Sequence, residues 1–335
     1  MAVRVTGARA CKTQPTNALV GLQTTPCALA LPVAEVEAAA SYAKAEKAAA
    51  TRRAYKSDFS IFQVWCADRG ASALPAEPAT VAAFLAWEAN HQTRPSTIGR
   101  RAAAIRYAHK LAGHDIPTDD ERVRATMRGI RRAVGSAPAK KTPATSDRIM
   151  AMAPVASTHL ADLRDRVLLL FGFAGAFRRS ELVALDIEDI EQTKDGLRVM
   201  IRHSKTDQEG KGAIIAIVRG AAACPVAAYK VWIEAANIST GPVFRPIAKG
   251  ERLQETRLTD RSVAKIVKAH AARIGLDPAG FSGHSLRSGF LTSAAARGAS
   301  IFKMMDVSRH KSMDTLRGYV RDAELFRDHA GAGLL

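Results

Sequence analysis

The chain has 335 residues, 47% of them hydrophobic, and is therefore long enough and apolar enough to fold as two domains with buried cores. Its 49 lysines and arginines outnumber the 32 acidic residues, and the formal charge of +17 favours a polyanionic partner, either nucleic acid or an anionic membrane. The most continuous apolar run, Val167 to Phe177, is much shorter than the roughly 20 residues of a membrane helix, so it predicts a buried helix.

The first 40 residues are expected to form a flexible tail. A secretory signal is the alternative, because Arg4, Arg9 and Lys12 precede an apolar stretch, but Gly21 and Pro26 interrupt that stretch. The four cysteines have no metal-type spacing and are too sparse for a disulfide framework, which is typical of a reducing cytoplasm. We therefore expect a cytoplasmic protein with free thiols and no metal site.

Residues 41–134 have the apolar spacing of four amphipathic helices. Positions three and four apart lie on one face of a helix, and no strand pattern interrupts the segment. This predicts a compact helical bundle. The four stripes are Tyr55, Phe59, Phe62 and Cys66; Val81, Phe84, Leu85 and Glu88; Ile98, Ala102, Ile105 and His109; and Val123, Met127, Ile130 and Val134.

Positive charge is concentrated between Thr97 and Thr145, where eleven lysines and arginines stand against four acidic residues, a net charge of +7. For any single residue, solvation of a helix face is the simpler interpretation. Such a density repels itself unless a polyanion neutralises it, so we expect contacts with nucleic-acid phosphates. The candidate DNA-binding residues are Arg100, Arg101, Arg106, Lys110, Arg128, Arg131, Arg132, Lys140 and Lys141.

Residues 135–146 are rich in alanine, proline, glycine and serine and lack an apolar period, which predicts an interdomain linker. Residues 147–335 then mix patterns. They contain a buried helix through Phe171, two strands within 197–204 and 212–218, and further helices towards the end of the chain. The predicted fold class is mainly α with a small antiparallel sheet, that is, α+β.

Two stretches of the second domain contain charged residues that are candidates for an active site. For these residues, a purely structural role explains the sequence at least as well as a functional one. Arg178 and Glu181 lie three positions apart where the apolar run ends, so they can share a helical face as a simple ion pair. Lys205 lies at the tip between the two predicted strands, and a lysine on such a loop usually faces solvent. A mobile hairpin could also deliver its ammonium group to a bound phosphate.

Two further stretches are more specific. His284 and Arg287 lie three apart at a predicted helix start, where unpaired backbone N–H groups and the helix dipole favour an anion such as a phosphoryl group. His310 precedes Tyr319 by nine residues, and a tyrosine two turns inside a helix is ordinarily half-buried. The arginines around Tyr319 are expected to be mostly surface charge.

The order and spacing of these motifs, with RRSEL at 178–182 and HSLR at 284–287, resemble the tyrosine recombinase family, also called the phage integrase family. The resemblance spans residues 45 to 330 and favours Arg178 over Arg179, because the family places its glutamate three residues after the arginine. Ser288 departs from the pattern, since many members have a histidine there.

The resemblance implies a helical core-binding domain (41–134) and a catalytic domain (147–335) that form a C-shaped clamp around duplex DNA. Tyr319 is then the nucleophile that forms a 3′-phosphotyrosyl link, and Arg178 and Arg287 hold the non-bridging phosphate oxygens. Lys205 is the general acid for the leaving 5′-oxygen. His284 assists proton transfer at the tyrosine, His310 hydrogen-bonds the phosphate, and Glu181 supports the set. No ATP, metal or other cofactor is implied.

The implied partners are double-stranded DNA with inverted-repeat sites, three further copies of the chain in a tetramer that forms a Holliday junction, and accessory DNA-bending proteins. The C-terminal helix after Tyr319 is expected to dock on a neighbouring protomer. A type IB topoisomerase, which relaxes supercoils with the same tyrosine chemistry, and a DNA-binding regulator without catalysis are the alternatives.

Overall fold

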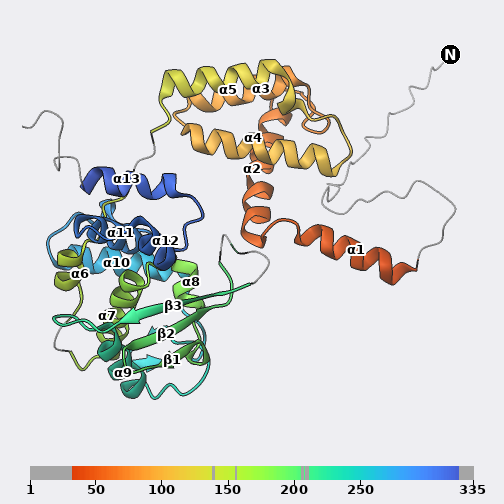
Figure 1. Ribbon diagram of the computed structural model, residues 1–335. Helices are drawn as coiled ribbons and strands as arrows, with labels where there is room; N and C mark the ends of the chain where they lie inside the picture. Colours follow the sequence, from red (N-terminus) through yellow and green to blue (C-terminus); the bar gives the residue numbers. More distant parts are fainter. Residues whose placement is uncertain (1–31, 138–139, 155–156, 205–206, 208–210, 324–335) are drawn as a thin grey trace, which may run out of the picture. The chain divides into compact units, whose positions relative to one another are not determined.

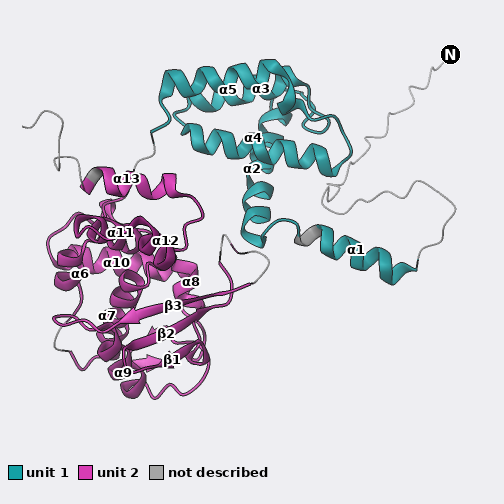
Figure 2. Ribbon diagram, viewed as in Figure 1, with its two compact units in different colours: residues 1–138 teal, residues 139–335 magenta. Residues whose placement is uncertain are grey.

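The computed structural model describes residues 32–137, 140–154, 157–204, 207 and 211–323. The chain divides into two compact units, residues 1–138 and 139–335 (Figure 2). None of the helices in the described ranges has the length and apolarity that crossing a membrane requires.

Unit 1 is helical, and its α-helices are labelled in Figure 1. Its core joins the apolar faces of α2 to α5 around Phe62, Phe84 and Ile105, with α2 packed on α4 and α3 packed on α5. Proline at the first turn begins α3 and α4, and Asp120 caps α5 by accepting a hydrogen bond from the Arg122 amide. The helices are α1 (Val33–Ala45), α2 (Ala49–Ala67), α3 (Pro78–Asn90), α4 (Pro95–Leu111), η1 (Pro117–Asp119) and α5 (Glu121–Val134).

Helix α1 differs from the predicted tail, which extended through residue 40. The helix begins at Val33, and every side chain described in it is exposed. Its sequence, VAEVEAAASYAKA, is dominated by alanine, the best helix former, but it has no apolar stripe. The structure therefore corrects the prediction for residues 33–40: helix propensity, which periodicity does not detect, defines this element. The rest of the predicted tail, residues 1–31, lies outside the described residues.

Unit 2 is mainly helical with a small antiparallel sheet, which confirms the predicted fold class. Strands β2 and β3 pair from Gly196↔Val218 to Ile201↔Ala213, as predicted, whereas the three-residue β1 was not foreseen because its polar sequence carries no strand signal. The elements are α6 (Ser146–Met152), α7 (Leu160–Ala174), α8 (Arg179–Ala184), η2 (Ile187–Asp189), β1 (Ile190–Gln192), β2 (Gly196–Ile201), β3 (Ala213–Val218), α9 (Pro225–Ala235), β4 (Ile247–Ala248), β5 (Arg252–Leu253), α10 (Asp260–Arg273), η3 (Pro278–Gly280), α11 (Ser285–Ala296), α12 (Ile301–Ser308) and α13 (Met313–Ala323).

The apolar helix α7 lies at the centre of unit 2, where Val167 and Phe171 are fully buried. Gly172 on α7 faces Leu286 on α11 so closely that a Cβ at position 172 would overlap the leucine side chain. This close approach brings the start of α11 next to the junction between α7 and α8. Two of the predicted motifs, which are more than 100 residues apart in sequence, therefore lie side by side.

Residues 142–145 belong to unit 2, although the sequence predicts them to be linker. The amide of Thr142 donates to the Gly280 carbonyl at 2.8 Å, and the amide of Ala144 donates to the Ser285 carbonyl at 2.9 Å. Ala144 is fully buried against Gly289, where a Cβ would overlap its backbone. We call residues 142–145 the strap. Backbone hydrogen bonds hold the strap in place, and the amino-acid composition of a segment does not predict such bonds.

Replacing Gly289 with alanine tests the packing of the strap. The added Cβ would overlap the backbone of Ala144, whose amide is bonded to Ser285. We expect Gly289→Ala to lower the free energy of unfolding by about 1–3 kcal/mol, as overpacking does. Gly129→Ala is the control, because a Cβ there meets nothing within 4 Å and alanine favours the helix. Urea denaturation compares the two variants, and an unchanged midpoint for Gly289→Ala would contradict this packing.

Candidate active site

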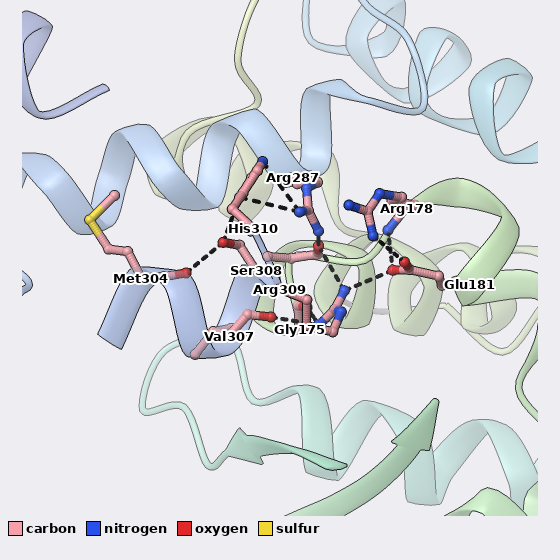
Figure 3. A network of polar contacts seen from close by, with 10 residues as sticks. Gly175, Arg178, Glu181, Arg287, Met304, Val307, Ser308, Arg309 and His310 are labelled. Carbon is pink, nitrogen blue, oxygen red and sulfur yellow. Dashed lines mark hydrogen bonds and ion pairs between the residues drawn. The ribbon is translucent and has the colours of Figure 1, made fainter. Parts of the chain in front are cut away.

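Four of the predicted site residues meet in one network, which Figure 3 shows. Arg178 is the N-cap of α8, and Glu181 lies one turn into that helix. Arg287 lies in the first turn of α11, and His310 follows the end of α12. The fold thus brings together residues from three separate segments.

Glu181 is the acceptor at the centre of this network and is only 3% exposed. The Arg178 guanidinium donates to Oε1 at 2.6 Å, and the Arg178 amide donates to Oε2 at 2.9 Å. Arg309 donates to Oε2 at 2.8 Å. Burial raises the pKa of the carboxyl, but Arg309 and Arg178 outweigh it and hold the pKa below its usual value. Glu181 is therefore a carboxylate that carries charged partners on both oxygens.

Arg287 is a buried cation with 1% of its surface exposed. Its Nη1 donates to the Ala176 carbonyl at 2.7 Å, and its Nη2 lies 3.3 Å from both ring nitrogens of His310. Burial lowers the pKa of Arg287 to about 9, with further repulsion from Arg178 and Arg309, and Tyr319 is close enough to oppose that shift. The side chain still keeps its charge at neutral pH, in a place suited to an anion.

His310 is held as a neutral ring. The Ser308 hydroxyl donates its single proton to the Met304 carbonyl at 2.6 Å, so at 2.7 Å it can only accept from Nδ1 of His310. This assigns the proton to Nδ1 and leaves Nε2 as an acceptor that faces Arg287. Burial, followed by repulsion from Arg287 and Arg178, lowers the pKa of His310 to about 4.

His284 and Tyr319 border the network. His284 is the N-cap of α11, and its pKa is lowered by partial desolvation and by repulsion from Arg287 and Arg178, although the residue remains exposed. Tyr319 is half-buried on α13, where it packs against the cluster that contains Leu291 and Met304. Both therefore lie next to the buried arginines.

Lys205 lies outside the described residues, but the base of its loop is defined. Ser204 and Asp207 form an antiparallel bridge, and the Asp207 carboxylate accepts from the amides of Lys211 and Gly212 at 3.1 and 2.8 Å. Ser204 and Asp207 also line a pocket of about 220 Å³ together with His310. The loop that carries Lys205 therefore starts and returns beside the network.

Arg309 is a member of the network that the sequence did not reveal. Its side chain is only 9% exposed, so it is an exception to the expectation that the arginines near Tyr319 are mostly surface charge. Its backbone is left-handed (φ 57°, ψ 39°), a conformation that sequence reasoning assigns to glycine or asparagine. No local signal marks an arginine for such a place.

The neighbouring arginines at the start of α8 have different surroundings. Arg178 points into the network, whereas Arg179 pairs with Asp260 at 3.0 Å on the surface and is 50% exposed. Within the described residues, no group of three or more histidine, cysteine or acidic side chains could hold a metal ion.

The candidate DNA-binding residues lie in both units and differ in their contacts and exposure. Arg100 pairs with Asp58 at 2.6 Å, Arg101 pairs with buried Glu88, and Arg106 and Arg128 pair with Asp119 and Glu121. Ion pairs within unit 1 thus neutralise part of the predicted cluster. Lys141 donates to the Ala279 carbonyl at 2.7 Å. The side chains of Lys110, Arg131, Arg132 and Lys140 are exposed.

The protonation state of His310 can be measured directly. Because its pKa is lowered from 6.5 to about 4, we expect a neutral ring protonated on Nδ1 throughout the range above pH 5 in the free protein. The unfolded chain takes up this proton first as the pH falls below about 6.5, so His310 reduces stability progressively between about pH 6.5 and pH 4. Imidazole ¹⁵N NMR, with His310→Asn for assignment, measures both tautomer and titration. A midpoint near 6.5 would contradict the desolvated geometry.

The chain is similar to a known protein family and to several known proteins. The model of the phage integrase family matches residues 142–325. An integrase/recombinase xerD homolog of Selenomonas ruminantium is 40% identical over 291 residues, which cover 85% of this chain and 85% of that protein. Tyrosine recombinase XerD of Pseudomonas putida is 25% identical and covers 84% and 90% of the two chains.

Two solved structures share the fold. The XerH recombinase bound to palindromic difH substrate has a TM-score of 0.57 at 15% identity and covers 77% of this chain and 72% of its own. A lambda integrase dimer bound to a COC′ core site has a TM-score of 0.56 at 17% identity, with coverages of 86% and 75%. The family model covers more than half of the chain, and the 40% identical relative covers most of it. The chain belongs to the phage integrase family and is a site-specific tyrosine recombinase, an enzyme that breaks and rejoins DNA.

Proposed function

We propose that Tyr319 is the nucleophile of this recombinase and that the network around Glu181 binds the scissile phosphate. The observation that carries the proposal is the network in which Arg178 bonds the buried Glu181 carboxylate and Arg287 contacts His310, beside the helix that holds Tyr319. The tyrosine oxygen forms a bond to phosphorus while the bond to the 5′-oxygen breaks. The products are a 3′-phosphotyrosyl link and a free 5′-hydroxyl. Attack by the 5′-hydroxyl of a partner strand reverses the step, and two rounds pass through a Holliday junction.

Arg178 and Arg287 stabilise the negative charge that builds on the non-bridging oxygens. Arg287 donates to the Ala176 carbonyl and contacts the neutral ring of His310, and neither partner carries a negative charge. A bound phosphate would place an anion next to this buried cation. A tyrosine with a pKa of about 10 is a weak nucleophile at neutral pH, and nearby positive charge favours its ionised form.

Three further groups move or hold protons in this scheme. Lys205 protonates the leaving 5′-oxygen. The position of Ser204 and Asp207 beside His310, at the base of the loop that carries Lys205, supports this role. His284 assists the transfer of the Tyr319 proton. A bound phosphate offsets the repulsion that lowers the pKa of His310, so it favours the protonated ring, which can then donate from Nε2 to the phosphate.

The proposed substrate is double-stranded DNA with inverted-repeat sites. Residues 41–134 serve as the core-binding domain, a tetramer assembles on two sites in the cytoplasm, and accessory DNA-bending proteins assist. Support comes from the charge of +17 and from the XerH and lambda integrase structures, which are bound to difH substrate and to a COC′ core site. WCADRG at 65–70 and FSGHSLRSG at 281–289 also look similar to Cre recombinase, whereas the relatives named above are Xer proteins.

The direct test is a covalent adduct. A binding site is first selected by recovering the duplexes that the protein retains from a random DNA library. The selected site is then synthesised with a nick next to the scissile phosphate, which traps the covalent intermediate. We expect wild-type protein to become attached to the DNA, and Tyr319→Phe to bind equally well without attachment. The measurement is denaturing gel electrophoresis of labelled DNA. An adduct that persists in Tyr319→Phe would refute the assignment.

The neighbouring arginines at the start of α8 provide a matched pair of variants. Arg178→Ala should slow adduct formation by about 10²–10³-fold, the usual cost of removing one donor to a developing oxyanion. Arg179→Ala should cleave at the wild-type rate, because its exposed pair with Asp260 lies outside the network. Single-turnover rates on the nicked duplex measure the difference. Equal rates for the two variants would contradict the role given to Arg178.

A further inference from the structure

Arg309 occupies an uncommon backbone position. It ends α12 in the left-handed region (φ 57°, ψ 39°), where a side chain with a Cβ is strained and glycine is at ease. A residue held in such a conformation needs compensating contacts elsewhere. Arg309 also comes directly before His310, so the backbone angles of Arg309 determine the position of the His310 backbone.

The guanidinium of Arg309 supplies those contacts from a buried place (Figure 3). Nη1 donates to the carbonyls of Val307 and Gly175 at 2.5 and 3.1 Å. Nη2 donates to Glu181 Oε2 at 2.8 Å and lies 3.2 Å from the Ala176 carbonyl. The group also lies over the ring of Phe177, 5.4 Å from its centroid. All of these atoms belong to the protein, so both Nη atoms of Arg309 are engaged within unit 2.

Two of the acceptors of Arg309 are shared with the arginines that are proposed to bind the phosphate. Glu181 Oε2 accepts from the Arg178 amide while Oε1 accepts from the Arg178 side chain. The Ala176 carbonyl accepts from Arg287 at 2.7 Å. Ala176 itself has a positive φ of 44°, so the orientation of its carbonyl is another strained feature. The guanidinium of Arg309 therefore contacts the acceptor that holds each phosphate-binding arginine, Glu181 for Arg178 and the Ala176 carbonyl for Arg287.

We propose that Arg309 is a positioning residue, which fixes Arg178 through Glu181 and Arg287 through the Ala176 carbonyl. This inference rests on the proposed function of those two arginines. Without Arg309, Glu181 loses one charged partner and the Ala176 carbonyl loses one donor, so both arginines gain rotational freedom. An error of about 1 Å in such groups can cost about 10²-fold in rate, because the transition state is stabilised only at the correct geometry.

A purely structural role is the competing explanation, since Arg309 also joins α12 to the α7–α8 junction. The two roles differ in what a variant loses. A structural residue affects stability, whereas a positioning residue affects the rate of the chemical step in protein that is folded and bound to DNA. A positioning residue also acts through Arg178 and Arg287, which stabilise the charge on the phosphate. A methylphosphonate substrate lacks that charge, so it removes this part of the effect.

Arg309→Gly is the informative variant, because glycine adopts the left-handed backbone without strain and removes the guanidinium. Arg309→Lys keeps the charge and loses the planar fork. Arg257→Lys is the matched control: Arg257 also joins a carboxylate, Asp186, to two carbonyls, those of Val183 and Leu185, outside the network. Each variant is compared with wild type for thermal unfolding, for affinity to the nicked duplex, and for the single-turnover rate of adduct formation.

We expect Arg309→Gly and Arg309→Lys to bind the duplex as wild type does and to form the adduct about 10- to 100-fold more slowly, whereas Arg257→Lys keeps the wild-type rate. The defect should shrink when the scissile phosphate is replaced by a neutral methylphosphonate. Added guanidinium ion should partly restore Arg309→Gly. Wild-type rates in both Arg309 variants would overturn the inference, as would equal defects on phosphate and methylphosphonate. Failure of wild-type protein to form any adduct would instead refute the proposed function.

Discussion

The carboxylate of Glu181 accepts charged donors on both oxygens, and the rest of the active site depends on it. Three guanidinium groups cluster around it, those of Arg178, Arg287 and Arg309. Two like charges about 4 Å apart repel by about 4 kcal/mol at an effective dielectric constant of 20, so such a cluster needs a buried anion. One carboxylate offsets part of that repulsion and leaves the site positively charged. The cluster therefore keeps an excess of positive charge for a phosphate.

The fold brings these charges together through close backbone approaches. Gly172 allows α11 to approach α7, and Gly289 allows the strap to pass against α11. Both contacts are made by packed elements with little room to adjust. The base of the hairpin between β2 and β3 lies close to these arginines, since Ser204 and Asp207 line the pocket beside His310.

The sequence predicts the large elements of the fold well, because long amphipathic stripes such as those of Phe62 and Ile105 determine them. It also identifies Arg178, Glu181, Arg287 and His310, which the structure brings into one network, because their order along the chain is distinctive. Features held by backbone hydrogen bonds or by helix propensity alone, such as the strap and α1, leave no periodic pattern. Arg309 was missed for a third reason, since its burial follows from tertiary packing that no local motif encodes.

The attachment of the strap limits how the chain can change in length between its two units. Thr142 and Ala144 are in register with Gly280 and Ser285, on either side of His284, so an added or lost residue among them would shift the start of α11. Within the connection between the two units, we therefore expect a change in length to leave the start of α11 in place only before the strap, after the end of α5. The strap therefore fixes the length of the chain next to the active site and leaves the segment before it as the place where the distance along the chain between the two units can change.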